Sequence, residues 1–197
     1  MGKEKYLNKI EELFKKSPVV SYGSIQRIIR NDKNVKQYTK QLIRNLIIKK
    51  KIKRLIKGYY TIYEDQSLIV LCLKQAYLGL QDALSFHDIW EQETIPIIIT
   101  AKKLRNGIRK VLGTNVLIRR MDKKYYFGVD YYKQGSFYLP YSDIEKTFID
   151  MVYFRENLSE SVIKTIRSKI NIKKLNLYLK IYPKNIRLKV MNKLNSR

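Results

Sequence analysis

A run of 30 residues without an acidic side chain constrains this chain more than any other feature. Residues 34–63 contain no Asp or Glu, and all nine of their charged residues are basic. Those nine are Lys36, Lys40, Arg44, Lys49, Lys50, Lys51, Lys53, Arg54 and Lys57. A solvated surface normally mixes both signs of charge, so a run of one sign indicates a polyanionic partner. The phosphates of nucleic acid are the natural counterpart.

The first half of this run has the periodicity of an amphipathic helix. Its apolar residues recur at helical spacing and predict a buried face of Val35, Leu42, Ile43, Leu46 and Ile47. The opposite face carries Lys36, Gln37, Lys40, Gln41 and Arg44. Asn34 is expected to cap the helix through its side-chain oxygen, because Gln37 follows at the spacing of a capping box. The helix should therefore begin near Val35.

The second half of the run predicts a β-hairpin. Residues 52–55 alternate, which puts Ile52 and Arg54 on one face of a strand. Lys57 and Gly58 then form a turn that leads into a second strand rich in tyrosine. A basic helix is thus followed directly by a basic hairpin.

Two shorter helices are predicted upstream of this pair. The first covers residues 3–16, and the second is capped by Ser21 or Ser24 and extends to Ile29, with a turn at residues 31–32. Helix, link, helix, turn, helix and hairpin is the order of a winged helix-turn-helix. We therefore assign residues 1–65 to a winged helix-turn-helix DNA-binding domain.

Eight residues of this domain are candidates for DNA contact. They are Lys36, Gln37, Lys40, Gln41, Arg44, Lys53, Arg54 and Lys57. Gln37, Gln41 and Arg44 are the candidates for base edges, because an amide can pair with adenine and a guanidinium with guanine. The lysines are better suited to phosphates.

The pattern of residues 66–197 predicts a second domain of α+β class. We expect it to serve as an effector or oligomerisation domain. We expect helices at 67–76 and 80–90, a buried strand at 95–100, and a basic connection at 101–113. Further strands are expected at 115–121, 124–129 and 136–140, in a small mixed or antiparallel sheet. Ser142 should cap the next helix, with Glu145 at the capping-box position and an apolar stripe of Ile144, Phe148, Ile149, Val152 and Tyr153. Two or three basic amphipathic helices follow Ser159.

Composition excludes several classes of function. The net charge is +24, from 41 Lys and Arg against 17 Asp and Glu, which is far more than solubility needs. The longest apolar runs are much shorter than the roughly 20 residues of a membrane span, and no apolar segment follows the charged N-terminus. We expect a cytoplasmic protein with no membrane partner, no cofactor and no metal. Cys72 should be a buried small hydrophobe, and the single histidine, His87, a helix-surface or packing residue.

Three other groups of residues allow a second interpretation. Tyrosines such as Tyr59, Tyr60, Tyr125, Tyr126, Tyr131 and Tyr132 could stack on bases, although such residues more often line strands. Gly135 and Ser136 before Asp143 and Glu145 superficially resemble a nucleotidyltransferase, but the spacing is short and a helix N-terminus already explains both acids. A second phosphate-binding surface could be formed by Arg105, Arg109, Arg119, Arg120, Lys164, Arg167, Lys169, Lys173 and Lys174.

Three phrases resemble the AbiEi-like family of antitoxins and transcriptional regulators of toxin–antitoxin operons. They are LIRNLIIKKKIKRLIKGYYTI, then LQDALSFHDIW followed by IPIIIT, and FYLPYSDIEKTFIDMV. The last is similar to an S-x-x-E-K-x-x-x-D helix, which corresponds here to Ser142, Glu145, Lys146 and Asp150. The resemblance spans roughly residues 17–152. It implies an N-terminal domain that binds inverted repeats in its own promoter and a C-terminal domain that opposes a nucleotidyltransferase toxin.

These observations predict a sequence-specific DNA-binding transcriptional regulator, an antitoxin-type repressor of its own operon, and not an enzyme. Double-stranded DNA is the expected partner, with a second copy in a homodimer and a cognate toxin as further candidates. One alternative is an architectural protein that binds DNA without sequence preference. The other is a nuclease or nucleotidyltransferase. Charge alone does not distinguish DNA from RNA.

Overall fold

A computed structural model describes residues 6–29 and 34–196, and its class is α+β, as the sequence predicts. The chain divides into two compact units, residues 1–72 with 110–114 and residues 73–109 with 115–197. A three-stranded sheet belongs to the first unit, and the second sheet has six strands in mixed orientation. The predicted small mixed sheet is therefore confirmed.

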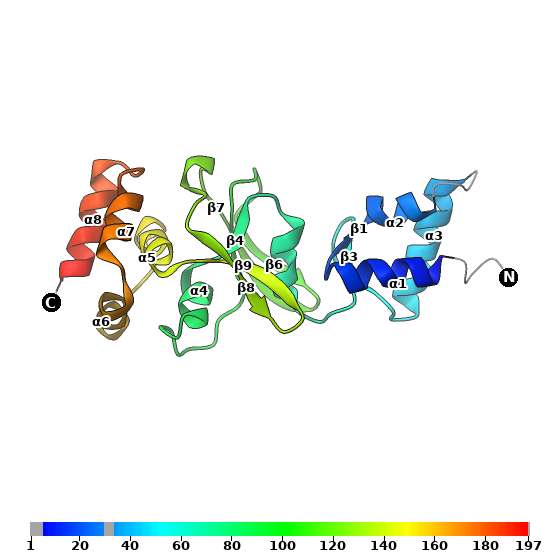
Figure 1. Cartoon of the computed structure of the whole chain (residues 1–197), viewed down its shortest axis with the longest axis horizontal. Helices are drawn as coiled ribbons and strands as arrows, with labels where there is room; N and C mark the ends of the chain where they lie inside the picture. The colour runs from blue at the N-terminus through cyan, green and yellow to red at the C-terminus, as the bar shows by residue number, and fades with distance from the viewer. Residues whose placement is uncertain (1–5, 30–33, 197) are drawn as a thin grey trace. The chain divides into compact units, whose positions relative to one another are not determined.

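Among the residues that the structure describes, three α-helices, a short 3-10 helix and the three-stranded sheet lie in the first unit (Figure 1). In chain order its elements are α1 (Leu7–Lys16), β1 (Val20–Ser21), α2 (Tyr22–Ile28), α3 (Val35–Ile48), β2 (Lys53–Ile56), β3 (Tyr59–Thr61) and the 3-10 helix η1 (Gln66–Cys72). Strand β3 lies between β1 and β2 and is antiparallel to both. This order and pairing match the predicted winged helix arrangement.

One apolar core holds these elements together. Ile10 and Phe14 of α1, Ile25 of α2 and Leu42 and Leu46 of α3 are all buried in it. Each such side chain stabilises the fold by about 1.5–3 kcal/mol relative to an exposed one. The spacing of these residues on each helix turns the polar faces outward, which is why α3 presents its cations to solvent.

The capping residues of α2 and α3 agree only partly with those predicted from the sequence. Ser21, one of the two predicted serines, caps α2 by accepting a hydrogen bond from the backbone N–H of Ser24 at 3.0 Å. Helix α3 begins at Val35 as expected, but Asn34 makes no side-chain capping bond to it. The capping box predicted for Asn34 is therefore wrong. The turn predicted at residues 31–32 lies outside the described residues.

The β2–β3 hairpin departs from strict alternation. The pairing register shifts between Arg54 and Ile56, which is a β-bulge. Ile52 and Leu55 are buried while Arg54 is exposed, so Ile52 and Arg54 do not share a face as predicted. Gly58 closes the turn with a φ of 85°, a conformation that favours glycine.

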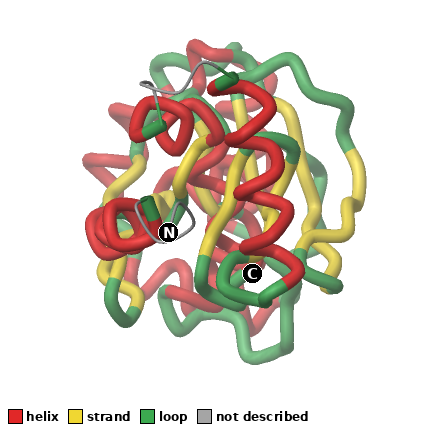
Figure 2. The backbone as a smooth tube through the Cα atoms, turned by 90° about the vertical axis from the view of Figure 1, so that its right-hand side faces the viewer, coloured by secondary structure: helices red, strands yellow, loops and turns green. Residues whose placement is uncertain are grey.

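The second unit is organised on the six-stranded sheet, with strand order β6-β7-β5-β4-β9-β8. Its elements are β4 (Ala76–Leu78), α4 (Leu80–Phe86), β5 (Ile97–Thr100), β6 (Gly107–Val111), β7 (Thr114–Arg120), the 3-10 helix η2 (Lys123–Tyr125), β8 (Val129–Gln134), β9 (Phe137–Ser142), α5 (Ile144–Tyr153), α6 (Glu160–Lys169), α7 (Ile172–Leu179) and α8 (Lys184–Asn195). Figure 2 draws the strands in yellow. Helix α5 lies between the sheet and the helices α7 and α8 (Figure 1).

Several predicted elements of this unit are corrected by the structure. The predicted break at residues 77–79 is strand β4, an interior strand between β5 and β9. The predicted helix at 67–76 is the shorter 3-10 helix η1, and α4 ends at Phe86 rather than at residue 90. The basic connection at 101–113 contains strand β6, and the strand predicted at 124–129 is replaced by η2. Pairing with neighbouring strands, rather than local pattern, decides such short segments.

The N-terminus of α5 also differs from prediction. Asp143, not Ser142, is the capping residue, and its Oδ1 accepts a hydrogen bond from the backbone N–H of Lys146 at 2.7 Å. Ser142 instead shares a hydrogen bond of 2.7 Å with the hydroxyl of Thr147. Glu145 does not complete a capping box, because its Oε1 accepts from the backbone N–H of Asn171 at 2.7 Å.

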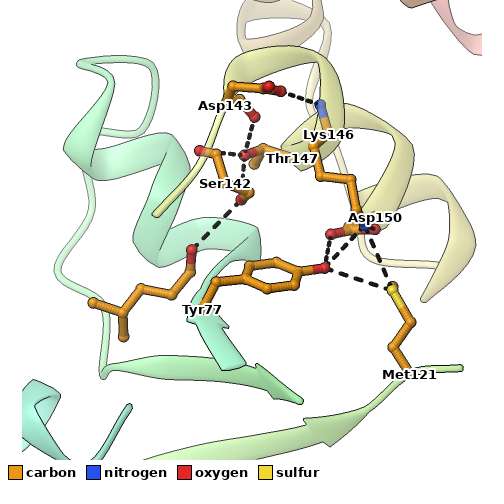
Figure 3. A network of polar contacts seen from close by, with 8 residues as sticks. Tyr77, Met121, Ser142, Asp143, Lys146, Thr147 and Asp150 are labelled. Atoms are coloured by element: carbon orange, nitrogen blue, oxygen red, sulfur yellow. Dashed lines mark hydrogen bonds and ion pairs between the residues drawn. The ribbon is translucent and has the colours of Figure 1, made fainter. Parts of the chain in front are cut away.

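Helix α5 is buried on most of its circumference, not along one apolar stripe. Lys146 and Asp150 are both 0% exposed and form an ion pair one turn apart. The hydroxyl of Tyr77, on β4, donates to Oδ2 of Asp150 at 2.6 Å, and Nζ of Lys146 donates to the same hydroxyl at 2.9 Å (Figure 3). Burial lowers the pKa of Lys146 and raises the pKa of Asp150, and the attraction between the two charges opposes both shifts.

Removing one member of this pair should destabilise the second unit severely. We expect Lys146→Met to lower the free energy of unfolding by about 3–5 kcal/mol, because Asp150 is left as a buried charge without a cation. Chemical denaturation of the full chain, followed by circular dichroism, measures the change.

The matched control is the double variant Lys146→Met with Asp150→Leu, which removes both charges while keeping similar volumes. It should be more stable than Lys146→Met alone, because no uncompensated charge is buried. A double variant that is less stable than the single one would contradict this account of the network.

Candidate nucleic-acid interface

The outward face of α3 is the first component of the interface. Thr39, Leu42, Ile43 and Leu46 are the buried residues of this helix. All five polar positions predicted for the opposite face are exposed, namely Lys36, Gln37, Lys40, Gln41 and Arg44. The hydroxyl of Thr39 donates to the carbonyl of Val35 at 2.6 Å, which satisfies the one polar side chain on the buried face.

A hollow beside α3 brings its cations together with the hairpin. Lys40 and Arg44 of α3 line it together with Arg54 of β2, and its volume is about 270 Å³. Tyr22, Tyr60 and Ile43 contribute to its walls. The fold thus brings Arg54 of the hairpin together with two cations of α3 that lie ten or more residues before it in the sequence. Such a hollow has the charge and apolar floor that suit a sugar-phosphate backbone.

Two of the predicted contact residues are engaged elsewhere. The ammonium of Lys53 pairs with the carboxylate of Glu64, and this hydrogen bond lowers the pKa of Glu64. Nε2 of Gln41 donates to Oδ1 of Asn45 at 3.2 Å along the same helix. Neither residue lines the hollow, and Lys53 has its charge neutralised locally. Lys57 is exposed at the hairpin turn.

Three residues of the interface were not identified from the sequence. The hydroxyl of Tyr22 donates to the carbonyl of Lys36 at 3.2 Å and so fixes α2 against the first turn of α3. Ile47, predicted to be buried, is 37% exposed, and Ile48 is 66% exposed. Both border the hollow. Ile47 lies at the edge of the apolar stripe, where helical periodicity does not decide burial, whereas no local signal indicated Tyr22.

Five of the nine residues proposed for a second phosphate-binding surface make contacts inside the second unit. Arg119 pairs with Glu156 at 2.9 Å, and Arg167 donates to the backbone carbonyls of Leu194 and Ser196. Lys169 donates to the carbonyls of His87 and Asp88, at 2.8 and 3.3 Å. Lys174 bridges Asp143 and Glu145. Arg109 donates to the carbonyl of Arg105 at 3.1 Å. The remaining four residues are exposed, namely Arg105, Arg120, Lys164 and Lys173.

Asp143 and Glu145, the acids considered for metal chemistry, are bound to neighbouring groups. Nζ of Lys174 lies 3.0 Å from Asp143 and 3.3 Å from Glu145, and the hydroxyl of Tyr178 donates to Asp143 at 2.8 Å. Partial burial lowers the pKa of Lys174, but the bond to Asp143 and the two negative charges raise it overall. Burial and the bond to Asp143 raise the pKa of Tyr178 to about 12. Within residues 6–29 and 34–196, no three His, Cys, Asp or Glu side chains gather as a metal site.

The single cysteine and histidine have the structural roles predicted for them. Cys72 is buried, and burial raises the pKa of its thiol to about 12. Nε2 of His87 lies 2.8 Å from the carbonyl oxygen of Ser142, and the ring packs edge-on against Phe86. Both predictions are confirmed. Over the described part of the chain, every helix is too short or too polar to cross a lipid bilayer.

Comparisons with known proteins bear on the fold. No protein-family model matches the chain, and no curated protein matches it. A solved structure, the crystal structure of RV2827C protein from Mycobacterium tuberculosis, is similar with a TM-score of 0.61. The match covers 97% of this chain and 76% of that chain, at 11% sequence identity. At this identity the likeness shows a shared fold alone.

Substitutions in the hollow should leave the fold intact. We expect Lys40→Ala, Arg44→Ala and Arg54→Ala each to change the free energy of unfolding by less than about 0.5 kcal/mol, because exposed side chains contribute little to stability. Leu42→Ala, on the buried face of the same helix, should cost about 2–5 kcal/mol. Urea denaturation distinguishes the two groups, and a large loss in any of the three cation variants would place that side chain in the core instead.

Proposed function

We propose that this protein is a sequence-specific DNA-binding transcriptional regulator, an antitoxin-type repressor of its own operon. The observation that carries the proposal is the hollow in which Lys40 and Arg44 of α3 meet Arg54 of the hairpin. A winged helix contacts DNA through these two elements, with the helix in the major groove and the wing on the flanking backbone. The absence of acidic residues from 34–63 supports the same surface.

The contacts divide by chemistry into base readers and phosphate binders. Gln37 and Arg44 are exposed and suited to base edges, through an amide on adenine and a guanidinium on guanine. Lys40, Arg54 and Lys57 bind phosphates and set the register of α3 in the groove. Gln41 reads a base only after it releases Asn45, and Lys53 contributes less because Glu64 already neutralises it.

Repression follows from occupying a promoter. Two copies read the halves of an inverted repeat, and the bound pair blocks access to the promoter. The second unit then supplies the contact between copies or with a cognate toxin, as the resemblance to AbiEi-like regulators implies. Such a protein acts in the cytoplasm, on double-stranded DNA, and needs no cofactor.

Binding to the DNA upstream of its own gene tests the proposal. Wild-type protein should prefer this DNA over scrambled DNA of equal length, and Arg44→Ala should weaken specific binding by about 1–3 kcal/mol, the usual value of a bidentate base contact. Lys40→Ala should weaken binding to both DNAs and lower the slope of log K against log salt by about one unit. Fluorescence anisotropy across a salt series measures these quantities.

Two matched variants serve as controls. Lys53→Ala should have a smaller effect than Lys40→Ala, because its charge is already paired. Lys184→Ala removes an exposed cation of α8 that belongs to neither candidate phosphate-binding surface, and it should leave specific binding unchanged. Equal affinity for both DNAs with a steep salt slope, unaffected by Arg44→Ala, would instead establish an architectural protein without sequence preference.

A further inference from the structure

A pocket in the second unit differs in charge from the rest of this basic protein. It has a volume of about 470 Å³ and lies between the segment after α4 and the first half of α6. Cavities of roughly 300–1,000 Å³ commonly hold small ligands. Trp90 and Glu91 form part of one wall, and Asn157, Ser161 and Thr165 form part of the other.

The walls of this pocket carry no cation. Among the residues that the structure describes, no Lys or Arg lines it, and Glu91 is its one charged residue. The segment that supplies Trp90 and Glu91 is acidic in sequence, because residues 75–101 contain Asp82, Asp88, Glu91 and Glu93 but no Lys or Arg. In a chain with a net charge of +24, this segment of the sequence has a net negative charge, and Glu91 is the acid of the segment that lines the pocket.

Trp90 and Glu91 are available to a ligand. Trp90 packs against the apolar core while lining the pocket, so its indole ring is held in place. Within the described part of the chain, Glu91 forms no ion pair with any Lys or Arg. Lys169 donates to the carbonyls of His87 and Asp88 at the far end of α6 and does not line the pocket.

A tryptophan and an unpaired carboxylate that line one pocket can together attract an organic cation. A positive group over an indole ring is attracted by the ring quadrupole, and tryptophan is the strongest of the aromatic side chains in this respect. The N-terminus of α6 carries a partial positive charge, but Glu160 in its first turn offsets it. The hydroxyls of Ser161 and Thr165 and the amide of Asn157 can bind the polar remainder of such a ligand.

We propose that this pocket binds a small organic cation, with its ammonium group on Trp90 and Glu91. The site is independent of the proposed DNA interface, which is built from other residues. Because Trp90 is the only tryptophan of the chain, its fluorescence reports directly on this pocket.

Titration of the full-length protein with choline chloride tests the proposal. Choline should change the fluorescence of Trp90 saturably, whereas 3,3-dimethyl-1-butanol, its neutral isostere, should bind at least tenfold more weakly because it lacks the charge. Sodium chloride at matched ionic strength should produce no saturable change.

Variants locate the binding in the pocket. Glu91→Gln keeps the shape of the side chain and should weaken choline binding by about five- to tenfold. Glu93→Gln, an exposed acid that does not line the pocket, should leave the affinity within twofold. Trp90→Leu, measured by calorimetry and checked for folding by circular dichroism, should abolish binding. A linear response to choline, equal binding of the neutral isostere, or an unchanged affinity in Glu91→Gln would overturn the proposal.

Discussion

The buried ion pair between Lys146 and Asp150 is the interaction on which the second unit depends. Two charges that are fully removed from water need hydrogen-bonding partners, because the burial of each charge alone destabilises the fold by several kcal/mol. Tyr77 supplies those partners from β4, since its hydroxyl bonds with both Lys146 and Asp150. The pair therefore fixes α5 against the middle of the sheet. Substitutions of the residues around it should be poorly tolerated.

The backbone around this pair is equally constrained. Gly128 lies so close that an added Cβ would be 2.9 Å from Cβ of Lys146 and 2.9 Å from a ring carbon of Tyr178. Its φ of 64° is also a conformation that favours glycine. The carbonyl of Gly128 accepts from the backbone N–H of Asp143 at 2.9 Å. A residue without a side chain is thus what lets the strand approach the start of α5.

Acidic residues of the second unit are used to hold its elements together. Asp143 and Glu145 share Lys174 and so attach α7 to the start of α5, and Glu156 pairs with Arg119. Asp82 accepts from the backbone N–H of Ile97 at 3.1 Å, which ties α4 to β5. Because these acids are already paired within the second unit, they do not neutralise the excess of Lys and Arg in the chain. Glu91 lines the pocket beside Trp90 and forms no ion pair among the described residues.

The basic face of α3 and the isoleucine-rich strand β5 can be predicted from the sequence. Helical periodicity and runs of β-branched residues determine secondary structure through interactions between residues that are close in the chain. The cations of 34–63 were equally evident, and their exposure needed only the helical repeat of Leu42, Ile43 and Leu46. Only the tertiary structure determines which of these cations lie together in the hollow. Arg54 is exposed and lines the hollow with Lys40 and Arg44, whereas Lys53 does not line it and pairs with Glu64. Strand β4 and the burial of Lys146 were also beyond local pattern, because a three-residue strand and a buried charge are stable only when distant segments supply their hydrogen bonds.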